Sequence, residues 1–114
     1  MQSIDDAECR RFTSTVEVIG RRWSAGILLA IARDAARFSE IAGAVDGLSD
    51  RLLAQRLREL EADDLVVREV IATTPVQVRY HLTASGVDLM RVLEPLVEWE
   101  QRWRPSPAAG ESAE

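Results

Sequence analysis

The stretch that decides the fold is FSEIAGAVDGLSDRLLAQRLRELEAD, residues 38–63. Its first part, residues 38–45, has the length of a short helix of about two turns. Asp46-Gly47 is a common turn dipeptide, and Ser49 is a good N-cap for a longer helix over about 49–63. A short helix, a tight turn and a longer helix are typical of a helix-turn-helix motif.

The longer helix has two chemically different faces. On a helical wheel its leucines lie within about 100° of one another and form one apolar stripe. Arg56 falls at the edge of this stripe, where a charge should be paired, and we expect a salt bridge with Glu40 as the candidate partner. The leucines are Leu52, Leu53, Leu57 and Leu60, and the opposite face carries Arg51, Ala54, Gln55, Arg58 and Ala62.

A β-hairpin is predicted directly after this helix. Residues 65–71 are rich in β-branched side chains, which favours a strand, and Thr73-Thr74-Pro75 interrupts it. Residues 76–82 alternate apolar and polar residues, the period of a half-buried strand. We expect Val76, Val78, Tyr80 and Leu82 on the core side and Gln77, Arg79 and His81 on the polar side.

Further helices flank this centre. Apolar spacing predicts helices over 5–19 and about 23–34, with Trp23 as a core aromatic residue. Thr83 can cap a last helix over about 84–103.

The last helix has more apolar surface than a surface helix needs, because apolar residues cover about half of its circumference. Either a second subunit or the first helix covers the surplus. We favour a second subunit, because the two tryptophans near the end of the chain have little left to cover them. The expected dimer residues are Leu89, Leu93, Leu96, Trp99 and Trp103.

The element order therefore predicts a mainly α fold with a β-hairpin wing (α+β), a winged helix-turn-helix that dimerises through its terminal helices. We expect one domain over residues 1–104. A disordered tail is expected over residues 105–114, which are rich in proline, alanine and glutamate.

The charge is unevenly distributed. The formal net charge is −5, and all basic residues are arginine. Residues 21–58 nevertheless carry seven arginines against four acidic residues. A basic centre in an acidic chain is compatible with a localised DNA contact surface and predicts weak non-specific binding.

Several classes of protein are not supported by the sequence. No apolar stretch approaches the roughly 18 residues of a membrane span, and the N-terminus lacks the apolar core of a signal peptide. Cys9 is the single cysteine, so no intramolecular disulfide is expected. His81 stands alone, and no catalytic triad, paired carboxylate site or phosphate loop occurs. We therefore expect a cytoplasmic protein that is not an enzyme and holds no metal or cofactor.

The polar face of the longer helix supplies the candidate base contacts. Arginine pairs with guanine and glutamine with adenine in the major groove, so Arg51, Gln55 and Arg58 are candidates. A solvated polar face is the alternative, and the hairpin that follows favours DNA. Ser49 and Asp50, at the helix start, can contact phosphate or cytosine, or simply cap the helix.

Three arginines outside this helix are candidate backbone contacts. Arg22 and Arg37 flank helix starts and are expected to contact phosphates. Arg79 is the candidate wing contact to phosphate or the minor groove, with plain solvation as an equal alternative.

A series of motifs spans about residues 9–100. They are Cys9, Ile19-Gly20-Arg21-Arg22-Trp23, Arg37-Phe38-Ser39-Glu40-Ile41, Leu48-Ser49, Leu57-Arg58-Glu59-Leu60, the stretch PVQVRYHLTASG over 75–86, and Trp99. In this order they closely resemble the HxlR family of winged-helix regulators, which are relatives of MarR. The sequence departs from the family pattern at Arg10, where proline is frequent, at Arg22, where lysine is usual, and at Asp64, where glycine is usual. The last difference puts the end of the preceding helix in question.

The resemblance implies a homodimeric DNA-binding transcription factor whose terminal helices form the dimer. Its partners would be a second copy and a double-stranded palindromic operator. Several family members sense oxidants, quinones or aldehydes through a cysteine at the position of Cys9, which implies an oxidant or small-molecule effector. Adjacent arginines favour the thiolate and nearby acidic residues oppose it, so a buried cysteine without a sensing role is the alternative.

A second function class stays open at the level of the sequence. A winged-helix module that binds proteins and not DNA would agree with the acidic net charge. Charge reversal at Arg51 and Arg58 separates the two, because only DNA binding depends on those side chains.

Overall fold

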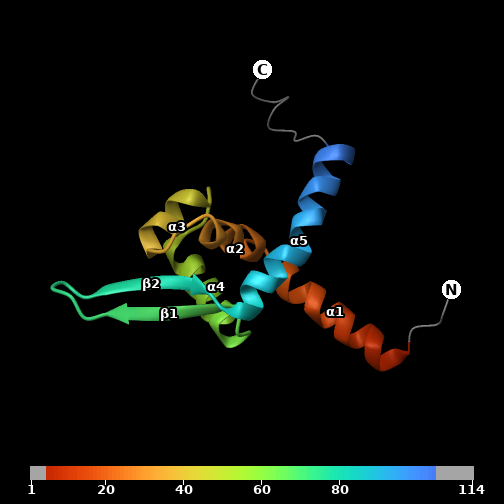
Figure 1. Cartoon of the computed structure of the whole chain (residues 1–114), viewed down its shortest axis with the longest axis horizontal. Helices are drawn as coiled ribbons and strands as arrows, with labels where there is room; N and C mark the ends of the chain where they lie inside the picture. Colours follow the sequence, from red (N-terminus) through yellow and green to blue (C-terminus); the bar gives the residue numbers. More distant parts are fainter. Residues whose placement is uncertain (1–4, 105–114) are drawn as a thin grey trace, which may run out of the picture.

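The computed structural model describes residues 5–104, and within them the chain forms five helices and one two-stranded antiparallel sheet (Figure 1). This order confirms the predicted winged helix-turn-helix, a mainly α fold with one hairpin. The predicted disordered tail, residues 105–114, lies outside the described residues. The elements are α1 (Asp6–Gly20), α2 (Ser24–Ala32), α3 (Phe38–Ala44), α4 (Asp50–Ala62), β1 (Val66–Ile71), β2 (Gln77–Leu82) and α5 (Ala84–Trp103).

Side-chain caps fix the helix starts. The Ser49 hydroxyl accepts a hydrogen bond from the Leu52 amide at 3.2 Å, and the Thr83 hydroxyl accepts one from the Gly86 amide at 2.9 Å. Both residues were predicted as N-caps, and each satisfies an amide that has no partner inside the helix. The starts of α4 and α5 are therefore set by the local sequence.

The end of α4 explains why glycine is usual at position 64. Asp64 has φ of 59°, in the left-handed region that glycine enters most easily and aspartate tolerates. The Leu65 amide donates to the Leu60 carbonyl and the Asp64 amide donates to the Glu61 carbonyl. This pair of bonds is a Schellman motif. The helix thus ends as it would with glycine, and the substitution changes the residue but not the turn.

The hydrophobic core lies in the middle of the chain. Its members come from α2, α3, α4 and the hairpin, and the most deeply buried include Ile27, Leu28, Ile41 and Leu53. In contrast, α1 has no buried residue and α5 has only Gly86. Figure 1 shows the consequence, because α1 and α5 project from the body formed by the other elements.

The hairpin is anchored to the body through both strands, since Val66 of β1 and Tyr80 of β2 belong to the core. β1 and β2 pair antiparallel, from Val66 opposite Leu82 to Ile71 opposite Gln77. The Tyr80 amide also donates to the Ala36 carbonyl at 2.7 Å, so the segment between α2 and α3 lies along the outer edge of β2.

The expected inward face of the second strand is only partly correct. Tyr80 is buried and Val78 and Leu82 are half-buried, but Val76 is 62% exposed. Val76 precedes β2 and lies in the turn of the hairpin, beyond the reach of the core, so alternation alone overextended the buried face.

The described residues include no helix with the length and hydropathy needed to span a membrane. They also include no cluster of three or more histidine, cysteine or acidic residues suited to a metal ion.

Candidate nucleic-acid interface

The outward face of α4 is the centre of the candidate interface. Arg51, Gln55 and Arg58 are exposed. On the opposite side, Leu53, Leu57 and Leu60 are at most 1% exposed. The leucines hold the helix rigidly on the body, and the polar side chains are presented to solvent. This is the two-faced helix that the sequence predicts, and an exposed helix of this width fits the major groove.

The three outward side chains differ in how free they are. The Gln55 amide donates to Glu59 at 3.4 Å, a long and therefore weak hydrogen bond. Among residues 5–104, no ion pair within 4.0 Å involves Arg51 or Arg58. Both guanidiniums are available for an external acceptor, and Gln55 becomes available when it releases Glu59.

The expected partner of Arg56 is wrong. Arg56 does not pair with Glu40; its Nη1 lies 2.9 Å from Glu59 Oε1, and its Nε donates to the Arg22 carbonyl at 3.0 Å. Glu40 is engaged elsewhere, because its Oε1 accepts hydrogen bonds from the amides of Ala36 and Arg37. Arg56 is a structural residue, as expected, but it ties α4 to the α1–α2 junction.

Glu59 takes part in the contacts that join α4 to the α1–α2 junction. Its Oε1 also lies 3.3 Å from Arg21 Nη1, beside the end of α1. Partial burial raises the pKa of Glu59, but hydrogen bonds from Gln55 and Arg56, with the charges of Arg56 and Arg21, outweigh it and hold the pKa below its ordinary value. The carboxylate therefore stays charged and holds α4 against the end of α1.

Arg22 and Trp23 form the turn between α1 and α2. Trp23 has φ of 79° and precedes α2. It is half-buried and packs against the core, which agrees with its interpretation as a packing residue. The exposed guanidinium of Arg22 lies 4.9 Å from the centre of the Trp23 ring, a cation–π contact. Arg22 is thus held close to the surface and keeps its outer nitrogens free.

The other predicted contacts lie at the start of α4 and at the edge of the wing. Ser49 uses its hydroxyl as the N-cap, and Asp50 is exposed in the first turn. Arg37 is exposed before α3, and its Nη2 donates to Gln77 Oε1 at 3.2 Å. Arg79 is half-buried and not fully solvated, and its Nη2 donates to Gln77 Oε1 at 3.4 Å. Gln77 was not predicted as a site residue, since alternation marks it only as polar.

The terminal helices carry a large uncovered apolar surface. On α5, Leu96 is 57% exposed, Trp99 42% and Trp103 70%. On α1, Phe12 is 71% exposed. The alternative in which the first helix covers the surplus is therefore wrong for these residues within one protomer. Leu89 and Leu93 are half-buried, and Leu89 packs against the core of its own protomer.

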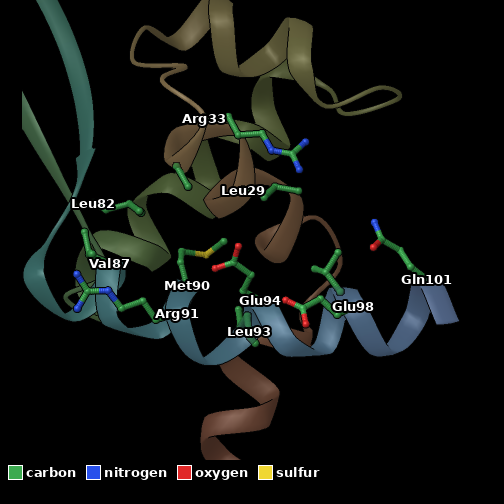
Figure 2. Close-up of a pocket in the computed structure, with 12 residues that line it drawn as sticks. Leu29, Arg33, Leu82, Val87, Met90, Arg91, Leu93, Glu94, Glu98 and Gln101 are labelled. Atoms are coloured by element: carbon green, nitrogen blue, oxygen red, sulfur yellow. The ribbon is translucent and has the colours of Figure 1, made fainter. Parts of the chain in front are cut away.

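A groove runs between α2 and α5. It has a volume of about 570 Å³ and is lined by side chains from both helices. Figure 2 shows Met90 and Glu94 projecting from α5 toward Leu29 of α2, with Arg33 above them. Leu93 belongs both to this lining and to the predicted dimer residues, so the groove adjoins the uncovered face of α5.

Cys9 lies on α1 and is exposed. The alternative, a cysteine buried where α1 packs at a dimer interface, stays a prediction. The thiol is accessible on the helix that carries Phe12.

Comparison with known proteins agrees with this geometry. The family model described as HxlR-like helix-turn-helix matches residues 18–107. The HTH-type transcriptional regulator YvaP of Bacillus subtilis is 40% identical over 95 residues, which cover 83% of this chain and 88% of YvaP. The reduced form of the transcriptional regulator YodB from B. subtilis superimposes with a TM-score of 0.77 at 33% identity and covers 85% of this chain and 95% of YodB.

A third similar structure is the redox regulator HypR in its reduced form, with a TM-score of 0.77 at 33% identity, covering 83% of this chain and 94% of HypR. The match to the family model includes the helix-turn-helix, the hairpin and α5. Motifs, fold and relatives agree, and the chain belongs to the HxlR-like helix-turn-helix family.

Proposed function

We propose that this helix-turn-helix regulator binds a palindromic duplex operator as a homodimer and inserts α4 of each protomer in a major groove. The observation that carries the proposal is the exposed face of Arg51, Gln55 and Arg58, held opposite leucines that are at most 1% exposed. A rigid helix with free guanidiniums is suited to base contacts, because a fixed backbone limits the entropy lost on binding.

The outward residues have different roles. Arg51 and Arg58 would each donate to O6 and N7 of guanine, and Gln55 would pair with adenine after it leaves Glu59. Ser49 and Asp50 lie where the helix start meets the DNA backbone, and Asp50 can accept from cytosine. Arg22, Arg37 and Arg79 would contact phosphates, which fix the position of the protein but carry little sequence information.

The dimer is supported by the uncovered faces of α1 and α5. Apolar side chains such as Leu96, Trp99 and Trp103 gain free energy when a second copy covers them. A two-fold pairing of protomers would repeat α4 at a fixed spacing. Operators of such dimers have half-sites about 34 Å apart, one turn of DNA.

The acidic net charge of −5 limits the competing interaction with arbitrary DNA. Non-specific affinity comes almost entirely from phosphate neutralisation. A regulator with a small basic surface therefore depends on base contacts for its affinity, and we expect a large difference between operator and random duplex.

The test is a gel-shift titration against the DNA upstream of its own gene and of neighbouring genes. The wild type should bind one of these duplexes with salt-sensitive affinity. Arg51→Glu and Arg58→Glu should each abolish the shift, because a reversed charge repels the groove. Arg91→Glu changes the same charge on α5 and should bind as the wild type does.

The protein-interaction module predicts different results. The DNA-binding proposal is refuted if neither the wild type nor any of the three variants shifts a duplex, while Arg51→Glu still binds a protein partner.

A second, regulatory function is favoured by the exposure of Cys9. We propose that modification of this thiol by an oxidant or an electrophile alters operator affinity through α1. HypR, to which the chain is similar, is named a redox regulator. Operator affinity of the wild type should change after treatment with a quinone or peroxide, and that of Cys9→Ser should not. Equal responses of the two proteins would exclude Cys9 as the sensor.

A further inference from the structure

Two arginines from different elements converge on one neutral oxygen. Arg37, which precedes α3, donates from Nη2 to Gln77 Oε1 at 3.2 Å. Arg79, on β2, donates from its own Nη2 to the same oxygen at 3.4 Å. The bond from Arg79 is longer than the roughly 2.7–3.2 Å that is usual for an N–H···O hydrogen bond, and the acceptor carries no charge. Two like charges thus share an amide that neutralises neither of them.

Arg79 is also incompletely paired. Its Nε is buried and has no hydrogen-bond acceptor among residues 5–104. A buried donor without an acceptor costs free energy, and the cost is larger for a charged group. Such groups occur where an external partner completes the pairing.

Two carboxylates lie near these arginines, Glu40 and Glu69, and neither forms an ion pair with them within 4.0 Å among residues 5–104. Glu69 lies opposite Arg79 in the strand pairing, and its Oε1 is 2.9 Å from His81 Nε2. Glu40 Oε1 accepts hydrogen bonds from the amides of Arg37 at 2.9 Å and Ala36 at 3.0 Å. These bonds, with the charges of Arg37 and Arg79, hold the pKa of Glu40 below its ordinary value. No carboxylate among residues 5–104 forms an ion pair with Arg37 or Arg79, so both guanidiniums remain without a charged partner.

We propose that Arg37, Gln77 and Arg79 form one binding site for a single DNA phosphate, at the junction of α3 and the wing. We call it the α3–wing site. This inference rests on the proposed function and specifies how the wing is attached to the DNA backbone. Figure 1 shows α3 beside β2, so one anion at their junction can meet both guanidiniums.

The phosphate would take over the place of the Gln77 oxygen as the shared acceptor. A phosphate offers two charged oxygens, which can bridge two guanidiniums better than one neutral amide oxygen can. Gln77 is then a positioning residue, which holds the two guanidiniums on one oxygen until DNA arrives. The two guanidiniums repel each other in the free protein, and both are attracted to the phosphate in the complex.

The first test is operator affinity as a function of salt for Arg37→Gln, Arg79→Gln and the double variant. The duplex is one selected by the wild-type protein from random-sequence DNA. Each single variant should bind about tenfold more weakly per protomer, the loss of one charge-assisted contact in each half-site. Because both side chains serve one phosphate in each half-site, the double variant should lower the salt slope of the dimer by about two, one per protomer, and not by about four. Arg91→Gln, on α5, is the control of equal charge and should leave the slope unchanged.

A second test locates the phosphate. Each phosphate of the half-site is replaced in turn by an uncharged methylphosphonate. At one position the wild type should lose affinity, while Arg37→Gln and Arg79→Gln lose no more than they already have. Two different positions for the two variants, or none, would overturn the shared site.

A third variant separates this role from a structural one. Gln77→Glu is nearly isosteric and places a permanent carboxylate between the two guanidiniums. It should raise the midpoint of thermal unfolding and yet weaken operator binding more than Gln77→Ala does. A purely structural role predicts that Gln77→Glu leaves operator affinity intact, and that result would overturn the proposal.

These outcomes are distinct from failure of the proposed function. If the wild type selects no duplex, both the function and the α3–wing site are wrong. If the wild type binds and the variants at Arg37 and Arg79 bind equally well with an unchanged salt slope, only the α3–wing site is wrong.

Discussion

The middle of the chain and its two terminal helices differ in how they bury their apolar side chains. The body from α2 to β2 encloses its own core, in which Leu53 and Leu57 are at most 1% exposed. α1 and α5 together supply one buried residue, Gly86, and leave Phe12 and Trp103 at least 70% exposed. The same chain thus contains a self-sufficient body and two helices that lack a cover.

The difference indicates that the body and the terminal helices have separate roles. The body can hold α4 in place without help, because the leucines of that helix are packed within one protomer. What one protomer cannot do is fix the distance between two copies of α4. The uncovered faces of α1 and α5 are where a second copy would set that distance. Under the proposed function, base reading would belong to the body and spacing to the terminal helices.

The largest effect should come from the core of the body. Leu57→Ala removes a buried side chain from α4 and should lower the free energy of unfolding by about 3 kcal/mol. Leu96→Ala, the same change on α5, should leave the unfolding of a dilute protomer nearly unchanged. Urea titrations at low protein concentration compare the free energies of unfolding of the two variants. Equal losses would show that the body and α5 do not differ in how they bury their apolar side chains.

The seam between the body and α5 should be nearly as sensitive. A Cβ added at Gly86 would lie 2.2 Å from the Leu65 carbonyl oxygen, a backbone atom that cannot move aside alone. Gly86→Ala should therefore cost about 2 kcal/mol of unfolding free energy. Gly43, in α3, has nothing within 4 Å of the same added atom. Gly43→Ala should be neutral or slightly stabilising, and a similar melting temperature for both variants would contradict the close packing at this seam.

The uncovered face of α5 should show its effect in association and not in folding. Leu96→Asp places a charge in the proposed dimer interface and should weaken self-association about thirtyfold, or about 2 kcal/mol. Sedimentation equilibrium measures the change. Ser85→Asp adds the same charge in the exposed first turn of α5 and should leave association unaltered, so an equal effect of both variants would argue against a specific interface.

The smallest effect is expected at the ion pairs that join α4 to the end of α1. Because the pKa of Glu59 is lowered in the folded protein, its contribution is complete above the unfolded value of about 4.3 and disappears as the pH falls through the folded value. Glu59→Gln should cost about 0.5 kcal/mol at neutral pH. The difference from the wild type should vanish under acidic conditions; a difference that grows on acidification would contradict the assignment.

Much of this division could be predicted from the sequence. The caps Ser49 and Thr83 act through the nearest amides, so local chemistry located the starts of α4 and α5. The spacing of leucines in α4 predicted its buried face, because a helix repeats its geometry at every turn. The surplus apolar residues of α5 predicted that some would stay uncovered within one protomer.

What the sequence could not supply were contacts between distant elements. The ion pair of Arg56 with Glu59 is an i,i+3 contact that helical spacing allows, but its hydrogen bond to the Arg22 carbonyl joins distant elements. Alternation placed Gln77 on a polar side of its strand, and the arginine that bonds its side chain, Arg37, comes from before α3. Such neighbours follow from the tertiary fold and have no periodic signal.

The separation of the two α4 helices in solution tests the central claim most directly. Gln55→Cys in a Cys9→Ser background gives one spin label on the outward face of each α4, and double electron–electron resonance then reports the distance between them. We expect a distribution centred near 34 Å, one turn of DNA, allowing for the length of the labels. A protein without dipolar coupling between labels, or with α4 helices at a separation far from one turn or a multiple of it, would contradict the account.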